Sequence, residues 1–204
     1  MAGNTRPLIG VLALQGDVRE HIHTLHELGY DTAMVRTPAD VASVDALVIP
    51  GGESSVIDKL SRIFGVRDSI VNRIHSGMPV LGTCAGLIML ADRITGGLAD
   101  QQTFGGLDIV VERNAFGSQS ESFETDITVS EIGDTPLHVA FIRGPVISSV
   151  GDDVTVLSTL PNGKIVGVRQ GNAVGVSFHP EVTGETALHR WFVESVVVPS
   201  LVDG

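Results

Sequence analysis

The segment from Pro79 to Leu90 places the strongest constraint on the fold. It begins with a short apolar run typical of a buried strand, continues through small residues, and ends in an apolar pattern typical of a helix. Its centre, Gly82–Gly86, has the sequence Gly-Thr-Cys-Ala-Gly, the cysteine counterpart of the G-x-S-x-G turn that joins a strand to a helix. Glycines on either side leave room for so sharp a turn. The segment therefore predicts that Cys84 stands at a strand-to-helix turn.

Cys84 is the only cysteine in the chain. At the N-terminus of a helix, free N–H groups and the helix dipole favour an anion, so this position lowers the pKa of a thiol and favours a nucleophilic thiolate. The alternative is a small buried apolar residue, which is what most lone cysteines are. A single cysteine cannot form an intrachain disulfide, so we expect a reducing, cytoplasmic location.

Apolar runs and helical patterns alternate through the first half of the chain. Residues 8–14, 31–36 and 45–50 have the length and apolar character of buried strands, with a helical pattern between the first two. This alternation predicts an α/β fold with a mostly parallel central sheet flanked by helices. Between residues 101 and 150 the alternation stops, and the pattern favours added antiparallel strands. We expect a single domain over residues 1–204.

Three further assignments concern element boundaries. Asp17 is expected to cap the first helix, and residues 41–44 to form a short connector. The helix after Cys84 is expected to continue to about Ile94. A final amphipathic helix is expected over Thr183–Val198.

The first predicted helix carries three histidines, His21, His23 and His26. Only His23 and His26 are neighbours on a helix surface, because residues two apart do not face each other. No carboxylate or cysteine completes a metal-ligand set with them. We therefore expect solvent-facing or capping histidines and no metal site.

The chain is acidic, with a formal net charge of -11 at pH 7. Nucleic acids and anionic membranes bind basic patches, so this balance argues against both as partners. No apolar run approaches the length needed to span a membrane, and the first residues lack a signal-peptide pattern.

A second glycine-containing turn, Gly51–Ser55, follows the strand at residues 45–50. Two glycines at the end of a parallel strand allow backbone N–H groups to approach a ligand closely. The alternative is a tight turn in which Ser54 or Ser55 caps the next helix. The functional interpretation gains weight because a nucleophile at a strand-to-helix turn needs a second oxyanion donor from a neighbouring loop.

The strand predicted over residues 173–178 leads directly into His179-Pro180-Glu181. Pro180 disfavours helical backbone at His179, and residues two apart in an extended chain point the same way. His179 and Glu181 can therefore form the base and orienting carboxylate that a nucleophile needs. Taken alone, a histidine in a turn explains this tripeptide equally well.

These segments, in chain order, carry a resemblance to a known family. Pro-Gly-Gly-Glu-Ser, Gly-Thr-Cys-Ala-Gly and Phe-His-Pro-Glu together resemble the class I, triad-type glutamine amidotransferases. Three further segments more narrowly resemble the glutaminase subunits of pyridoxal 5′-phosphate synthases: Leu14–His21, Val111–Gly117 and Phe141–Pro145. The resemblance extends from Ile9 to about Val197 and implies an α/β fold with a flavodoxin-like core.

The resemblance implies hydrolysis of L-glutamine through a Cys-His-Glu triad. Cys84 would attack the side-chain amide carbon, His179 would activate the thiol and protonate the departing ammonia, and Glu181 would hold His179. The oxyanion would be stabilised by the N–H groups of Ala85 and of Gly51 or Gly52, the largest single contribution in many enzymes of this kind. No metal and no organic cofactor is implied for this chain.

The resemblance also implies a set of glutamine-binding residues, namely Gly52, Glu53, Ser54, Arg113, Ile142 and Arg143. Within this set we expect Glu53 to meet the α-ammonium group and one of the two arginines to meet the α-carboxylate.

The family resemblance further implies a protein partner. Members pass ammonia to a synthase subunit, a (β/α)8 barrel that builds pyridoxal 5′-phosphate from a pentose phosphate and a triose phosphate. Glutaminase activity is then expected to depend on that partner. Gln15 and Gly16 follow the first strand near the site, and a peptide that contains glycine can reorient at low cost.

Three alternatives stay open at this point. The chain could serve another amidotransferase, such as one of histidine or purine synthesis. It could be a related cysteine hydrolase that acts on a different amide or γ-glutamyl bond. A non-catalytic scaffold on the same fold is disfavoured, because a scaffold needs none of Cys84, His179 and Glu181.

Overall fold

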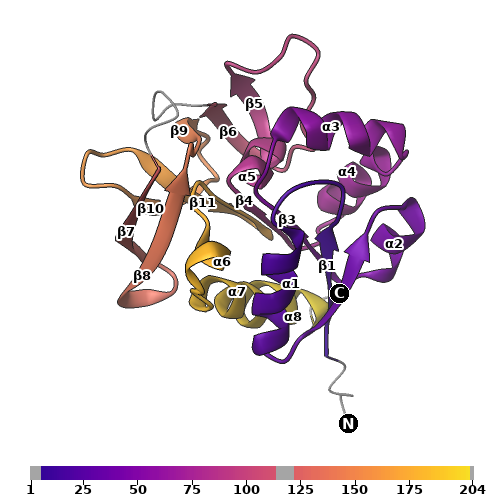
Figure 1. The fold of residues 1–204 in the computed structure, drawn as a ribbon, viewed down its shortest axis with the longest axis horizontal. Coiled ribbons are helices and arrows are strands. Elements are labelled where there is room, and N and C mark those ends of the chain that lie inside the picture. Colours follow the sequence, from indigo (N-terminus) through magenta and orange to yellow (C-terminus); the bar gives the residue numbers. More distant parts are fainter. Residues whose placement is uncertain (1–5, 114–121, 203–204) are drawn as a thin grey trace.

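A computed structural model of the chain describes residues 6–113 and 122–202, so Asn114–Gly117 of the resembling segments lie outside the described part. Within it, strands form one large sheet in the order β2-β1-β3-β4-β12-β11-β9-β6-β5, with β10 paired to β11 (Figure 1). Its strands are β1 (Leu8–Leu12), β2 (Asp31–Val35), β3 (Ala46–Ile49), β4 (Val80–Thr83), β5 (Ala91–Thr95), β6 (Leu107–Glu112), β9 (Val146–Val150), β10 (Thr155–Thr159), β11 (Ile165–Gln170) and β12 (Ala173–Val176). A separate antiparallel pair consists of β7 (Ser122–Val129) and β8 (Gly133–Ile142).

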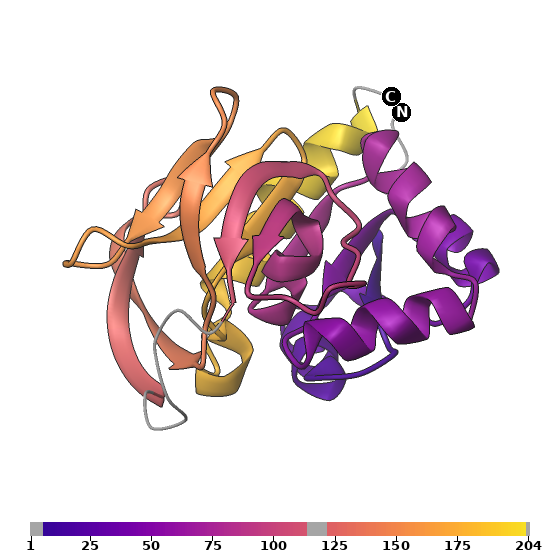
Figure 2. The same cartoon turned by 90° about the horizontal axis from the view of Figure 1, so that it is seen from above.

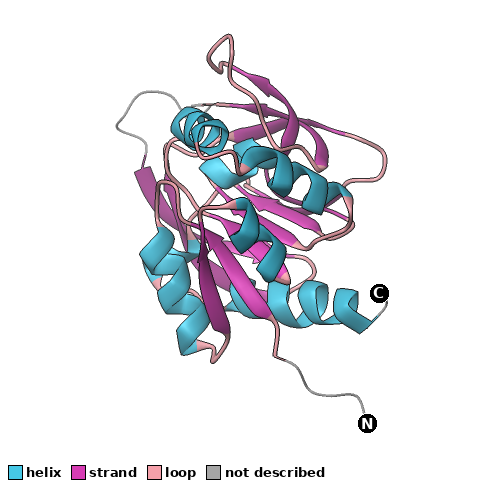
Figure 3. Cartoon of the chain, turned by 90° about the vertical axis from the view of Figure 1, so that its right-hand side faces the viewer, coloured by secondary structure: helices cyan, strands magenta, loops and turns pink. Residues whose placement is uncertain are grey.

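The strands β2, β1, β3, β4 and β12 run parallel to one another. Their side chains alternate between two buried layers: Ile9 and Val48 face one side, and Leu47 and Ile49 face the other. Helices cover both sides, as Figure 3 shows. One side carries α1 (Val18–Glu27), α7 (Ala187–Trp191) and the π-helical segment η1 (Phe192–Val197), and the other carries α2 (Pro38–Ser43), α3 (Ser54–Ile63), α4 (Arg67–His75) and α5 (Ala85–Leu90).

Antiparallel strands extend the parallel half of the sheet. β11 pairs antiparallel with β12, β9 and β10, and β9 pairs antiparallel with β6. Seen from above, these strands and the β7–β8 pair lie on the opposite side of the molecule from α3 and α4 (Figure 2). The predicted fold class is therefore confirmed, with the antiparallel strands in the second half of the chain.

The β7–β8 pair is joined to the sheet by aromatic packing. The Phe141 ring stacks on Phe123 with 4.9 Å between centroids, and it meets the edge of Phe178 at 5.7 Å. Phe141 and Phe178 are fully buried. This packing places β8 beside the chain that leaves β12, immediately before His179.

Three predicted boundaries were wrong. Residues 41–44 belong mostly to α2, which Pro38 begins and Thr37 caps: Asp40 N–H donates to Thr37 Oγ1 at 3.3 Å, and Thr37 N–H donates to Asp40 Oδ2 at 2.9 Å. The helix after Cys84 ends at Leu90, because the chain becomes extended at Ala91 and pairs with β6.

The expected final helix is divided as well. The short helix α6 (Pro180–Thr183) ends at Gly184, whose φ of 76° is left-handed, and α7 starts only at Ala187. A last helix, α8 (Val198–Val202), follows η1. In the described ranges, no helix has both the length and the apolar character required to cross a membrane.

Candidate active site

Cys84 occupies the predicted strand-to-helix turn. β4 ends at Thr83 and α5 begins at Ala85, and between them Cys84 has φ 48° and ψ −102°, a region that residues with a side chain rarely adopt. The Cys84 N–H donates to the Val176 carbonyl oxygen at 2.8 Å, which ties the turn to β12. A side chain at Gly86 would collide with the backbone of Ile49, so only glycine lets α5 begin this close to β3. Strained backbone of this kind is typical of functional sites.

His179 and Glu181 come together as predicted, but by a different geometry. His179 Nδ1 lies 2.8 Å from Glu181 Oε1. The extended conformation ends at His179 itself, which precedes α6, and Glu181 lies in the first turn of that helix with Pro180 as its first residue. The His179 N–H donates to the Ala140 carbonyl oxygen at 2.8 Å, so β8 fixes the backbone of the histidine.

A second carboxylate also contacts this histidine. Asp17 Oδ2 lies 3.3 Å from His179 Nδ1. Asp17 occupies the predicted cap position of α1, but its side chain makes no capping hydrogen bond, because the carboxylate turns towards His179 instead. The sequence contained a signal for this contact, since Asp17 lies in the loop after β1 and the carboxyl ends of parallel strands meet at one edge of a sheet.

The His179 ring is surrounded by groups that favour its protonated form. Burial lowers the pKa of His179, but hydrogen bonds to Asp17, Cys84 and Glu181 outweigh this effect and raise the pKa to about 12. We therefore place the proton of this cluster on His179, which makes the ring an imidazolium next to the Cys84 thiol. A protonated imidazole stabilises a neighbouring thiolate and can later donate its proton to a leaving group.

The same cluster also has the composition of a metal site. The ligand atoms of Asp17, His179 and Glu181 all lie within 4.8 Å of one another. Both carboxylates, however, converge on a single atom, His179 Nδ1, where one proton satisfies them together. We interpret the cluster as a hydrogen-bonded acid–base group on this geometry.

Two buried histidines lie behind Glu181. His21 Nδ1 is 2.8 Å from His189 Nε2, and His21 Nε2 is 3.1 Å from Thr83 Oγ1 and 3.5 Å from Glu181 Oε1. The expectation of a solvent-facing or capping residue was wrong for His21, which is fully buried, and His23 and His26 are exposed. The helical spacing of His21 from Leu25 already placed it on the apolar side of α1.

The two buried histidines predict a pH dependence of stability. Burial lowers the pKa of His189 to about 4, and burial together with His189 and His179 lowers that of His21 well below its usual value. Between pH 6.5 and 4 the unfolded chain binds a proton at His189 that the folded chain does not, so the free energy of unfolding falls with decreasing pH, by up to about 1.4 kcal/mol per pH unit for this group. His189→Gln keeps an N–H for His21. It removes the uptake of one proton on unfolding, so the free energy of unfolding should depend less steeply on pH, by up to about 1.4 kcal/mol per pH unit.

Urea unfolding at a series of pH values measures this slope. His23→Gln, an exposed histidine of α1, controls for the substitution itself. If the free energy of unfolding depends on pH equally in His189→Gln and in the unsubstituted chain, His189 has the same pKa in the folded and the unfolded chain, and the prediction is wrong.

A pocket of about 60 Å³ lies over the thiol. Its lining contains the proposed nucleophile, two of the three candidate oxyanion donors and every residue predicted to bind glutamine, namely Cys84, Ala85, Gly52, Glu53, Ser54, Arg113, Ile142 and Arg143, together with Ile88. The Ile142 carbonyl oxygen is 4.0 Å from Cys84 Sγ. Gly51 is not part of the lining and packs against the His179 ring instead. The structure thus brings together residues from four separate segments of the chain.

The charged residues of the pocket are not equivalent. Arg113 Nη2 donates to Glu53 Oε1 at 2.6 Å, and only 12% of the Arg113 side chain is exposed. Arg143 is exposed, has φ 48°, and makes no hydrogen bond or ion pair with any residue in the described ranges. The alternative interpretation of this turn, a serine cap for α3, was wrong: Glu53 is the cap and accepts from Ser55 N–H at 3.3 Å, because its longer side chain folds back over the first turn.

The loop after β3 is interlocked with the loop after β1. The Asp17 N–H donates to the Gly51 carbonyl oxygen at 3.1 Å, and the Glu53 N–H donates to Gln15 Oε1 at 2.7 Å. Because a trans peptide places its C=O and N–H on opposite sides, the Gly52 N–H points away from Asp17. Gly16 has φ 102°, and a side chain there would collide with the Gly51 carbonyl, so this contact requires glycine.

Comparison with known proteins identifies the family. The sequence model of the SNO glutamine amidotransferase family matches residues 11–198. This chain belongs to the SNO glutamine amidotransferase family. The resemblance inferred from the three motifs is thereby confirmed.

Individual proteins similar to this chain are a synthase subunit from two bacteria and a glutamine amidotransferase of known structure. The pyridoxal 5′-phosphate synthase subunit PdxT of Clavibacter michiganensis subsp. michiganensis is 54% identical over 202 residues, which cover 96% of this chain and 97% of the relative. The protein of the same name from Leifsonia xyli subsp. xyli is 54% identical over 196 residues, covering 96% and 98%. A solved structure described as a glutamine amidotransferase superposes with a TM-score of 0.85 at 45% identity, covering 91% of this chain and 97% of that one.

Proposed function

We propose that this SNO-family chain hydrolyses L-glutamine to L-glutamate and ammonia and delivers the ammonia to a pyridoxal 5′-phosphate synthase subunit. The observation that carries the proposal is the pocket in which Cys84 meets a carboxylate, Glu53, and an exposed guanidinium, Arg143. An α-amino acid presents the two complementary charges. The names of the relatives at 54% identity support the synthase as partner.

The proposed reaction proceeds through a thioester on Cys84. The thiolate attacks the side-chain amide carbon, and the N–H groups of Ala85 and Gly52 stabilise the oxyanion that forms. The His179 imidazolium donates its proton to the nitrogen as the C–N bond breaks, which releases ammonia. The neutral His179 then takes a proton from water, the resulting hydroxide attacks the thioester, and glutamate leaves with the thiolate restored.

Glutamine would be held by opposite charges at its two α-groups. Glu53 Oε1 already accepts hydrogen bonds from Arg113 and Ser55, whereas Oε2 accepts none from the described residues and is available to the α-ammonium group. Arg143 has no partner in the described ranges, so we assign it to the α-carboxylate. Arg113 then acts through Glu53 rather than as the main carboxylate ligand.

The interlocked loops give the partner a route to control the site. The Gly51–Gly52 peptide, whose N–H is a proposed oxyanion donor, is held by the Asp17 N–H, and Gly16 packs directly against it. A synthase subunit that contacts the loop after β1 would therefore move the oxyanion donor at low cost, because glycine backbone reorients easily.

The cytoplasmic location that we expect from the sequence stays a prediction.

Ammonia release from glutamine tests the proposal, measured for the chain alone and with a pyridoxal 5′-phosphate synthase subunit. We expect release that rises when the synthase is added. Strong release with no partner effect would favour a glutaminase of another amidotransferase. No release under either condition would favour a cysteine hydrolase with a different amide substrate.

A further inference from the structure

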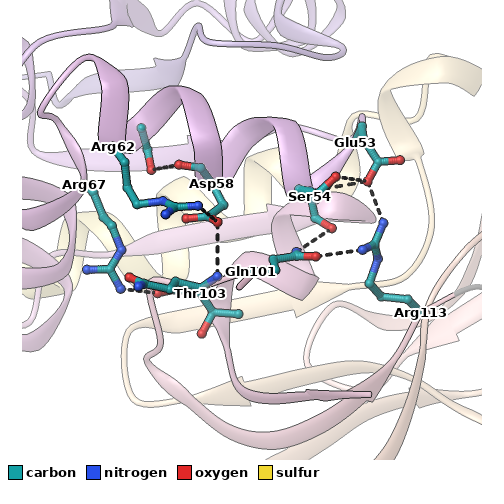
Figure 4. Close-up of polar contacts among 11 residues, drawn as sticks. Glu53, Ser54, Asp58, Arg62, Arg67, Gln101, Thr103 and Arg113 are labelled. Atoms are coloured by element: carbon teal, nitrogen blue, oxygen red, sulfur yellow. Dashed lines mark hydrogen bonds and ion pairs between the residues drawn. The ribbon is translucent and has the colours of Figure 1, made fainter. Parts of the chain in front are cut away.

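A polar network extends from the pocket to the segment before β6 (Figure 4). Arg113 Nη2 donates to Glu53 Oε1 at 2.6 Å, and Arg113 Nη1 donates to Gln101 Oε1 at 2.7 Å. Gln101 Nε2 in turn donates to Ser54 Oγ at 3.0 Å. The amide of Gln101 therefore bridges Ser54 at the start of α3 and Arg113 after β6, although it does not line the pocket itself.

The chemistry of the partners fixes the orientation of this amide. An arginine side chain only donates hydrogen bonds, so Gln101 must present its oxygen to Arg113. Its NH2 group is then directed to Ser54 Oγ, as Figure 4 shows. Rotation of the amide would place its NH2 group against the Arg113 donors and lose the bond to Arg113, so the bridge holds Arg113 in one position.

The backbone around Gln101 is held by bonds that do not involve its side chain. Gln102 N–H donates to Asp58 Oδ2 at 3.1 Å, Arg67 Nη2 donates to the Thr103 carbonyl oxygen at 2.8 Å, and Phe104 N–H donates to the Met89 carbonyl oxygen at 2.6 Å. Removing the Gln101 amide therefore leaves this segment anchored. The hydrogen bonds of the Gln101 amide instead hold two residues that line the pocket, Ser54 and Arg113.

We propose that Gln101 is a positioning residue for the α-amino end of glutamine. It fixes Arg113, which holds Glu53 through Oε1 and leaves Oε2 directed to the α-ammonium group. This inference rests on the proposed function and adds to it a residue that governs substrate binding without contact with the substrate. It makes Gln101 important for glutamine affinity and unimportant for the reactivity of Cys84.

The first test is steady-state glutamine hydrolysis with the synthase subunit present. Gln101→Leu keeps the size of the side chain and removes both hydrogen bonds, so KM should rise about tenfold while kcat stays within about twofold. Gln102→Leu is the matched control, because the adjacent glutamine is exposed and only its backbone N–H takes part in the network. Gln101→Ala removes the same bonds without added apolar bulk and replaces Gln101→Leu if that variant does not fold.

The second test separates substrate recognition from thiol reactivity. A diazoketone analogue of glutamine, which needs the amino acid pocket, should inactivate Gln101→Leu about tenfold more slowly than the unsubstituted chain. Iodoacetamide, which carries no α-amino or α-carboxyl group, should alkylate Cys84 at an unchanged rate.

An unchanged KM in the Gln101 variant, or an equal change in Gln102→Leu, overturns the inference, and so does a slower reaction with both reagents. If the unsubstituted chain does not hydrolyse glutamine with the synthase present, the proposed function fails on its own.

Discussion

Cys84→Ala should abolish glutamine hydrolysis, lowering kcat by more than about 10³-fold, because Cys84 supplies the only thiol in the lining of the pocket and the Ser54 hydroxyl there is bonded to Gln101. The same substitution should lower the pKa of His179, since Cys84 is one of the groups that raise it to about 12. Glutamate formation measures the first effect, and NMR titration of the His179 ring measures the second. Both effects come from one sulfur atom, so they should appear together.

Binding of glutamine to Cys84→Ala provides the control. Glu53 and Arg143 are unchanged in this variant, so calorimetry should still detect glutamine binding. Hydrolysis at an appreciable fraction of the original rate would show that the nucleophile lies elsewhere, and the fold would then serve a different chemistry.

Glu181→Gln should lower kcat by about 10³-fold to 10⁴-fold. The orienting carboxylate of a triad holds the histidine tautomer and stabilises the imidazolium, and an isosteric amide does neither. Glu181 is buried and contacts His179 Nδ1 at 2.8 Å. An amide that donates towards Nδ1 would leave the ring nitrogen on the Cys84 side as a donor, unable to take the thiol proton.

Asp17→Asn is the matched comparison for Glu181→Gln, because both substitutions exchange a carboxylate for an amide at the same nitrogen. Asp17 lies at 3.3 Å and its side chain is 36% exposed, so water replaces much of what is lost. We expect kcat to fall less than about tenfold. Equal losses in the two variants, measured over a range of pH, would mean that the carboxylates share the orienting role.

The sequence was sufficient to predict the parallel half of the fold, because buried parallel strands are continuous apolar runs and glycine-containing loops follow β1 and β3. It was insufficient for α2 and β5, which depend on features outside hydrophobic periodicity. α2 begins at Pro38, because the fixed φ of proline suits the first position of a helix as well as the end of a strand. β5 continues a helical apolar pattern and becomes a strand because β6 is beside it.

For the site, motifs were enough where neighbouring residues act together. Cys84, His179 and Glu181 belong to short segments whose local geometry carries the chemistry. His21 and His189, separated by 168 positions, meet only when α1 and α7 pack on the same face of the sheet. Gln101 likewise has no motif, because its role follows from a bridge between Ser54 and Arg113 that only the folded chain forms.

The most direct test of the central claim is the intact mass of the chain, quenched in acid during glutamine turnover with the synthase present. We expect a fraction of the chain to be heavier by one γ-glutamyl group, with the added mass on the peptide that contains Cys84 and absent from Cys84→Ala. Continued ammonia release with no adduct on Cys84, or with an adduct on another residue, would contradict a thioester at the turn between β4 and α5.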